Sequence, residues 1–221
     1  MAFAAPGRDC PALAAPGRDC PACPRLVAYR ADNRRQFPDW HNAPVDSFGD
    51  LESRLLVVGL APGLRGANRT GRPFTGDFAG DLLYRTLAAT GFAVGDYGAA
   101  LDDGLVLNDC RITNVVRCAP PGNRPLGQEL AACNRFLAAE IKAMAGLRAV
   151  LALGRLAHDG VLGALGRPRK DAVFGHGATH ALGPGLRLYD SYHCSRLNTN
   201  TGRLTEDMFH AVANTIRADL G

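Results

Sequence analysis

Short apolar runs alternate with longer amphipathic segments along most of the chain. Apolar runs bounded by polar residues, glycine or proline predict buried strands at 54–60, near 112–116, at 148–153 and at 186–192. Apolar residues at helical spacing predict helices at 78–90, 128–145, 155–165 and 204–219. Strands separated by helices are typical of a parallel sheet covered on both faces. The pattern therefore predicts an α/β protein, a three-layer α/β/α arrangement with a central, mostly parallel four-stranded sheet.

The N-terminal segment has a different composition, rich in Ala, Pro and Gly. The nine-residue unit AAPGRDCPA occurs twice, at 4–12 and at 14–22. Two copies of so short a unit do not build a repeat architecture. We therefore expect residues 1–17 to form a flexible tail and residues 18–221 to form a single domain with a full core.

Composition and charge narrow the class of protein. The formal net charge is +4 and comes almost entirely from arginine, since the only lysines are Lys142 and Lys170. Arginine suits phosphate contacts, so the charge is compatible with DNA binding. No apolar stretch approaches the ~20 residues of a membrane span, and no secretory signal is expected. We expect a monomer in the cytoplasm, where the seven cysteines serve as metal ligands or free thiols.

The polar segments follow the predicted strands, where sites form in parallel sheets. Residues 59–77 form a glycine-rich loop that lets a ligand approach the backbone, yet they match neither a Walker loop nor a dinucleotide fingerprint. An ordinary connecting loop is the alternative, and Phe74 is equally compatible with a core position. Asp77 precedes the helix at 78–90, and its position alone favours helix capping over catalysis.

The cysteines and histidines supply candidate chemistry. Cys20 and Cys23 form a C-x2-C pair, and Cys118 and Cys133 complete a set that suits an iron–sulfur cluster or zinc, with scattered thiols as the alternative. Cys10 lacks a second cysteine three residues later, and Cys110 and Cys194 are not part of this set. His193 follows the last strand and precedes small polar residues suited to phosphate contacts. The other histidines, including His158, His176, His180 and His210, show no comparable setting.

Four segments together carry a resemblance to a known family: CPACPRLVAYR at 20–30, GLAPGLRGANRTGRPFTGDFAG at 59–80, ITNVVRCAPPGNRPL at 112–126 and YHCSRLNTNTGRLT at 192–205. They resemble the uracil-DNA glycosylase superfamily, most closely its type 5 branch, which is related to the type 4 iron–sulfur enzymes. The resemblance covers residues 18–217. It implies a [4Fe–4S] cluster held by Cys20, Cys23, Cys118 and Cys133.

The resemblance also implies roles for the site residues. Phe74 is similar to the aromatic platform for a flipped base, Asn114 to the asparagine that contacts the base edge, and His193 to the histidine that donates to the base carbonyl. The backbone of Gly59, Ala61, Pro62 and Gly63 completes the base pocket. Contacts to DNA are expected from Arg69, Ser195, Arg196, Leu197, Asn198 and Arg203. Among these, Arg196 and Leu197 resemble the wedge that enters the base stack.

One departure from related branches indicates which carboxylate takes part in catalysis. Type 4 relatives carry Glu at the position of Leu60, and other branches have a polar residue at that of Ala61; neither side chain here can activate water. This resembles the type 5 pattern, which assigns the duty to Asp77 as general base or electrostatic stabiliser. Asp77 can also cap a helix, whose dipole would keep the carboxylate ionised. Cys194 replaces the apolar residue or proline of many members, which bears on the stiffness of the loop.

The expected activity is hydrolysis of the N-glycosidic bond of uracil in DNA, which leaves an abasic site. Hypoxanthine, xanthine and other altered bases are expected as secondary substrates, and the cluster is expected to be structural. One rival is a DNA-binding iron–sulfur protein that does not turn over or stays covalently trapped on its abasic product; Asp77 and Asn114 argue against it. Another rival is a zinc-binding hydrolase, since four thiolates suit either metal.

Overall fold

The computed structural model describes residues 15–221; most of the predicted tail, including Cys10, lies outside the described residues. Its central sheet has the strand order β4-β1-β5-β7-β6. The strands are β1 (Leu55–Gly59), β4 (Cys110–Asn114), β5 (Ala149–Leu153), β6 (Thr179–Gly183) and β7 (Leu186–Ser191). Neighbours among β4, β1, β5 and β7 pair in parallel, which confirms the predicted sheet. The fifth strand, β6, is an addition to the prediction and pairs antiparallel with β7 at the edge.

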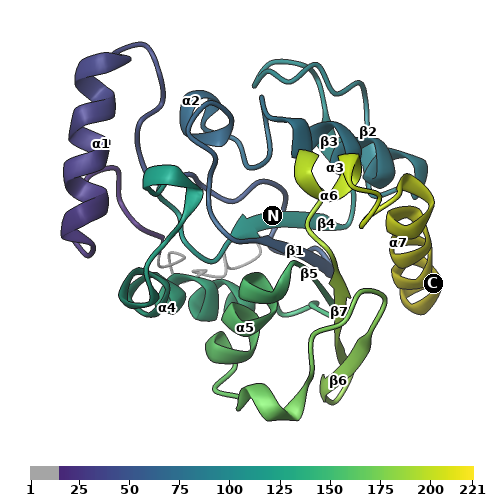
Figure 1. The fold of residues 1–221 in the computed structure, drawn as a ribbon. Coiled ribbons are helices and arrows are strands. Elements are labelled where there is room, and N and C mark those ends of the chain that lie inside the picture. Colours follow the sequence, from purple (N-terminus) through teal and green to yellow (C-terminus); the bar gives the residue numbers. More distant parts are fainter. Residues whose placement is uncertain (1–14) are drawn as a thin grey trace, which may run out of the picture.

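Helices cover both faces of this sheet (Figure 1). In β1, Leu55 and Val57 belong to one buried cluster, and Leu56 and Val58 belong to the other, because successive strand residues point to opposite faces. The first cluster packs under α3 (Phe78–Ala89) and α7 (Glu206–Leu220), and the second under α4 (Gly127–Ala143) and α5 (Arg155–Ala164). The predicted three-layer α/β/α fold is therefore confirmed.

Smaller elements surround these layers. They are α1 (Pro24–Gln36), α2 (Ala67–Thr70), α6 (Arg196–Asn200), the two-stranded pair β2 (Ala93–Val94) and β3 (Val106–Leu107), and the 3₁₀ turns Pro121–Asn123 and Arg169–Asp171. The strand predicted near 112–116 lies two residues earlier. The two residues that follow β4 still pair with the end of β1 and the residue after it: the Val115 and Val116 N–H groups donate to the carbonyls of Gly59 and Leu60, at 2.9 Å each.

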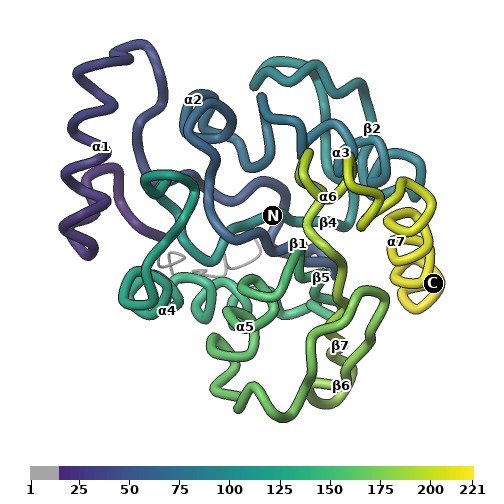
Figure 2. Tube along the Cα trace, in the orientation of Figure 1, coloured from purple at the N-terminus to yellow at the C-terminus, as the bar shows by residue number. Residues whose placement is uncertain are grey.

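The loops at the carboxyl ends of the parallel strands carry most of the irregular structure. The chain leaves β1 for α2, β4 for the Pro121–Asn123 turn, and β7 for α6, and Figure 2 traces these paths away from the same edge of the sheet. Across residues 15–221, no helix combines the length and apolar character needed to cross a membrane.

Candidate active site

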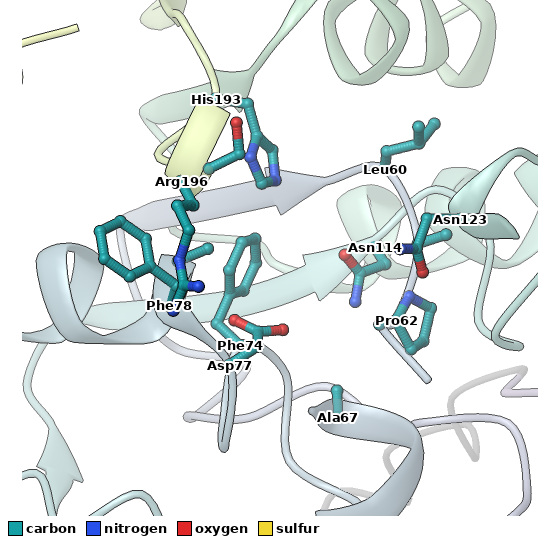
Figure 3. A pocket seen from close by; sticks show the side chains of 14 residues that line it. Leu60, Pro62, Ala67, Phe74, Asp77, Phe78, Asn114, Asn123, His193 and Arg196 are labelled. Carbon is teal, nitrogen blue, oxygen red and sulfur yellow. The ribbon is translucent and has the colours of Figure 1, made fainter. Parts of the chain in front are cut away.

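A cavity of about 360 Å³ opens at this edge of the sheet (Figure 3). It is lined by Leu60, Ala61, Pro62, Gly63, Ala67, Phe74, Asp77, Phe78, Ala79, Asn114, Asn123, His193, Ser195 and Arg196. The structure thus brings together Asp77, Asn114 and His193, which come from the segments after β1, at the end of β4 and after β7. Gly59 lies against the cavity residues, because a Cβ there would approach Asn114 Oδ1 to 2.4 Å and the Phe74 ring to 2.6 Å.

Phe74 combines burial with a strained backbone. Its side chain is 6% exposed and lines the cavity, so the core and platform interpretations are compatible. Its φ is +55°, a left-handed conformation that a bulky residue adopts only when its surroundings impose it. The Phe74 and His193 ring centroids lie 6.0 Å apart with planes at 30°. The ring therefore forms a wall opposite His193.

A buried ion pair holds the segment that carries Phe74. The Arg72 guanidinium donates to both Asp103 oxygens, at 2.9 and 2.6 Å, and to Thr75 Oγ1 at 2.7 Å. The Arg72 hydrogen bond lowers the pKa of Asp103 far below its usual range. The Tyr97 hydroxyl donates to the Phe74 carbonyl at 3.1 Å. These contacts over-determine the backbone at Phe74 and explain how its strain persists.

Asp77 is both a helix cap and a cavity residue. Its Oδ1 accepts from the Gly80 N–H at 3.3 Å at the start of α3, so the predicted cap is confirmed. Its Oδ2 lies so close to Gly66 that a Cβ there would come within 2.4 Å. Burial raises the pKa of Asp77, even though the backbone N–H groups of Gly80 and Ala79 act to lower it. Desolvation therefore outweighs the capping hydrogen bonds in its effect on the pKa of Asp77.

The other two predicted catalytic side chains are polar groups in apolar surroundings. Asn114 is 2% exposed at the carboxyl end of β4. Burial lowers the pKa of His193 to about 4, so its imidazole is neutral at pH 7. Asn198 Nδ2 donates to the His193 carbonyl at 2.8 Å and fixes the turn into α6. His193 is therefore positioned to act as an uncharged N–H donor.

The predicted DNA contacts lie around α6 and α2. Ser195 and Arg196 line the cavity, and the Arg196 guanidinium stands 5.1 Å from the Phe78 ring centroid. The Leu197 side chain, the other half of the predicted wedge, is 73% exposed. Arg203 stands over the Tyr192 ring, Arg69 is exposed on α2, and Asn198 makes the internal hydrogen bond described above. Their contacts with DNA stay predictions.

Asn123 is a cavity residue that the sequence analysis missed. It has a φ of +57° and ends the Pro121–Asn123 turn, which brings its side chain to the cavity end near Asn114 and Pro62 (Figure 3). Asparagine tolerates this conformation better than most residues. The Pro-Pro-Gly-Asn sequence was a turn signal, but a turn signal alone does not say where the turn lies.

The four predicted metal-ligating cysteines meet at one place. Cys20 and Cys23 at the start of α1, Cys118 after β4 and Cys133 on α4 line a single small cavity. The Arg30 guanidinium donates to Cys118 Sγ at 3.6 Å, and the Arg117 backbone N–H donates to Cys133 Sγ at 3.4 Å. Burial raises the pKa of Cys118 to about 11. Cys110 and Cys194 are buried elsewhere, in the cluster under α3 and α7.

A buried histidine–aspartate group contradicts the expectation that the other histidines have no special setting. His158 Nδ1 lies 2.7 Å from Asp190 Oδ1, and His180 Nε2 lies 3.1 Å from Asp190 Oδ2. His158 Nε2 faces the Ala172 carbonyl at 3.1 Å. Both ring nitrogens of His158 thus face oxygen atoms. Burial lowers its pKa, but Asp190 outweighs burial and the net pKa is raised. Because Asp190 and the Ala172 carbonyl already contact both ring nitrogens of His158, these side chains form a buried hydrogen-bond network.

Comparison with known proteins agrees with this fold. The model of the uracil DNA glycosylase superfamily matches residues 47–217, and the chain belongs to that superfamily. Type-5 uracil-DNA glycosylases from Thermus thermophilus and Pyrobaculum aerophilum are 46% and 43% identical to it, over 85% and 90% of this chain and 87% and 88% of their own. A type-4 uracil-DNA glycosylase from Thermotoga maritima is 40% identical over 42% of each chain. The longer matches place the chain in the type-5 branch and confirm the resemblance.

Proposed function

We propose that this protein is a DNA repair glycosylase that removes uracil from DNA. The observation that carries the proposal is the joint position of Asp77, Asn114, His193 and Phe74 around one cavity of about 360 Å³. This volume falls within the range of small-molecule sites, about 300–1,000 Å³. The superfamily and the type-5 relatives support the same activity.

Binding of the base follows from the walls of the cavity. A base inside a duplex cannot reach these residues, so the nucleotide must leave the stack at a cost of a few kcal/mol. The extruded base stacks on Phe74, whose strained backbone is already in place before binding. The Asn114 amide, which offers both a donor and an acceptor, pairs with the edge of the base.

The chemistry divides between His193 and Asp77. As the N-glycosidic bond breaks, its electron pair moves to the base, and the neutral His193 N–H stabilises the developing charge on a base carbonyl. Asp77 stabilises the positive charge at C1′ of the sugar and accepts a proton from water, whose oxygen bonds to C1′. The water proton finally resides on the released base. A carboxylate whose pKa is raised by burial is a better proton acceptor than an ordinary aspartate.

The direct test uses a labelled oligonucleotide with a single uracil, treated with alkali after incubation to cleave abasic sites. The wild-type protein should yield the cleaved product, and the same oligonucleotide with thymine should not. A wild-type protein that leaves the uracil strand intact contradicts the proposed function. Product that forms without alkali treatment contradicts a monofunctional enzyme, and protein bound covalently to the strand supports the trapping alternative.

We also propose that Cys20, Cys23, Cys118 and Cys133 hold a [4Fe–4S] cluster. The residues present fit such a group, since four sulfurs face one cavity and two N–H donors point at them. Within residues 15–221, the only three Cys, His, Asp or Glu ligand atoms that lie within 4.8 Å of one another are those of His158, His180 and Asp190. Sulfurs bound at 2.3 Å to one tetrahedral zinc would all lie about 3.8 Å from one another, and no three of these four cysteine sulfurs lie that close together.

The cofactor proposal has its own readout, independent of glycosylase activity. Purified protein should be brown, absorb broadly at roughly 400 nm, and contain iron and acid-labile sulfide in equal amounts. Colourless protein with one zinc per chain contradicts the proposal. When bound, the cluster supplies cross-links between the N-terminal segment, the loop after β4 and α4, and no step of the chemistry above needs it.

Substrate breadth is a finer proposal. We expect hypoxanthine and xanthine to be excised more slowly than uracil, because the aromatic wall of Phe74 stacks on any base. An excision panel with the three bases in single- and double-stranded DNA tests this expectation. Strict exclusivity for uracil would contradict it.

A further inference from the structure

The backbone that leads into His193 is held by a second histidine, which no step of the proposed chemistry uses. His176 lies on the segment 172–178, which precedes β6. Its Nδ1 accepts from the Tyr192 backbone N–H at 3.2 Å, and its ring stacks on the Tyr192 ring with centroids 5.0 Å apart and planes at 19°. Because Tyr192 immediately precedes His193, His176 contacts both the backbone and the side chain of the residue that leads into the proposed donor.

This contact defines the protonation state of His176. A backbone N–H only donates, so Nδ1 must present a lone pair to Tyr192, which requires the neutral ring with its proton on Nε2. The Ser191 hydroxyl lies 3.4 Å from the same nitrogen. His176 is half-buried, and burial lowers its pKa, an effect that a hydrogen bond to the Met208 backbone only partly offsets. The neutral, accepting form therefore prevails at pH 7.

The buried histidine–aspartate group holds the segment that carries His176. The Gly175 N–H donates to Asp190 Oδ2 at 3.3 Å, and the Gly177 N–H donates to the Asp190 carbonyl at 2.9 Å. The residues on both sides of His176 are thus tied to one residue of β7. The imidazole of His176 consequently has a fixed position from which it can orient the chain at the end of that strand.

The chain around Tyr192 is also restrained on either side. The Gly154 N–H donates to the Ser191 carbonyl at 2.8 Å, and the His193 carbonyl accepts a side-chain hydrogen bond from α6, also at 2.8 Å. His176 holds the peptide N–H between these two contacts. Loss of this middle contact would let the peptide plane rotate and displace the His193 ring, and a displacement of about 1 Å in a catalytic group can cost about 100-fold in rate.

We propose that His176 is a positioning residue, which orients the His193 imidazole toward the carbonyl of the departing base by holding the Tyr192 N–H. The inference rests on the proposed function and deepens it by adding a residue behind the cavity wall. The residues that line the base cavity, named above, do not include His176, so its effect on the reaction passes through His193.

The test is a double-mutant cycle measured by single-turnover excision of uracil from a duplex. His176→Leu removes the acceptor and should lower the rate of bond cleavage about 10- to 100-fold, with a smaller change in KM. His176→Asn keeps an acceptor as many bonds from Cα as Nδ1 and should stay within about threefold of wild type. In the His193→Ala background, His176→Leu should lower the rate less than about twofold, because the side chain that it positions is already gone.

A second readout does not depend on activity. The Tyr192 amide should exchange its hydrogen about five- to tenfold faster in His176→Leu, as expected for the loss of one hydrogen bond, and the His193 ring resonances should shift. Both should stay near their wild-type values in His176→Asn. The matched control is His210→Asn, which changes another half-buried histidine, on α7, and should leave both readouts and the rate unchanged.

The outcomes separate the two proposals. Equal effects of His176→Leu in the wild-type and His193→Ala backgrounds indicate a general loss of stability and overturn the positioning role. Unchanged Tyr192 exchange in His176→Leu overturns it as well. A wild type that excises no uracil, while Tyr192 exchange and the His193 resonances respond as expected, contradicts the proposed function and supports the orientation of His193 by His176.

Discussion

Replacing Asp77 by asparagine separates the two roles that the structure gives to one carboxylate. Oδ1 caps α3 through the Gly80 N–H at 3.3 Å, and Oδ2 faces Gly66 beside the cavity. Asparagine keeps a carbonyl oxygen for the cap and is as good a capping residue as aspartate. It removes the negative charge and the ability to accept a proton. Asp77→Ala removes both functions and serves as the comparison.

The magnitudes follow from these roles. Loss of a general base lowers the rate about 10²–10⁴-fold, equivalent to about 2.7–5.4 kcal/mol of transition-state stabilisation. Loss of the cap in Asp77→Ala costs about 0.5–2 kcal/mol of the free energy of unfolding. Burial raises the folded-state pKa of Asp77, so the folded protein is stabilised by a bound proton at low pH and loses that contribution as pH rises through the raised pKa. The asparagine side chain is neutral at pH 7 and therefore buries no charge. The free energy of unfolding of Asp77→Asn should lie within about 1 kcal/mol of that of wild type.

Two measurements check this separation. Single-turnover excision from a uracil duplex reports the chemistry, and urea denaturation at pH 7 reports the cap. Both variants should lose activity to a similar extent, and only Asp77→Ala should lose stability. Asp77→Asn activity within tenfold of wild type would refute a catalytic role and leave Asp77 as a cap.

Three further predictions follow from the same geometry. The acid limb of the rate–pH profile should lie above the pKa of an ordinary aspartate and persist in His193→Ala, because it reports protonation of Asp77, whose pKa is raised by burial; a profile in which the limb disappears with His193 would contradict this. Asp103→Asn should cost about 3–5 kcal/mol of unfolding free energy in a denaturation experiment, since it leaves the buried Arg72 guanidinium without its carboxylate. It should also raise KM more than it lowers kcat, because Phe74 loses its support, and unchanged kinetics would refute the link. Cys133→Ser should abolish the absorbance at roughly 400 nm and weaken the binding of a labelled DNA duplex, measured by fluorescence anisotropy; intact absorbance would exclude Cys133 as a ligand.

The layers of the fold were predictable because the four parallel strands are short, mostly buried segments that alternate with amphipathic helices. The edge strand β6 was not predictable, because only one of its five residues is buried and its pairing with β7 is irregular between Ala181 and Gly183. The helix α1 was missed for a related reason. Only three of its residues are buried, and two of them, Arg30 and Asn33, are polar, so no apolar stripe marks it. Edge strands and polar helices depend on partners distant in sequence, which local periodicity does not report.

The site was predictable to the extent that motifs mark it. Asp77, Asn114 and His193 were found through the family resemblance, because each occupies a strand end or helix start with little distinctive local pattern. The left-handed backbone of Phe74 was not predictable, since it depends on Asp103 and Tyr97, which lie some twenty to thirty residues further along the chain. Likewise, the raised pKa of His158 depends on a carboxylate 32 residues away in the sequence.

The proposed cluster and the base pocket share a loop, and the contacts of that loop determine what loss of the cluster would do. Asn114 ends β4, and Cys118 and Asn123 follow on the same loop, with Cys133 on α4. The buried Glu140 on α4 accepts from Arg111 at 2.6 Å and from Thr113 at 2.8 Å, so β4 is tied to α4 without any metal. Asn123 is exposed in a turn between two cysteines, and Arg25 on α1 donates to the neighbouring Arg124 carbonyl at 3.0 Å and pairs with Glu129 on α4 at 2.7 Å. Cluster loss should therefore leave Asn114 and the chemistry largely in place, while α1 and the Asn123 turn lose part of their anchorage and keep the contacts of Arg25. This is why Cys133→Ser is expected to weaken DNA binding more than the rate of bond cleavage.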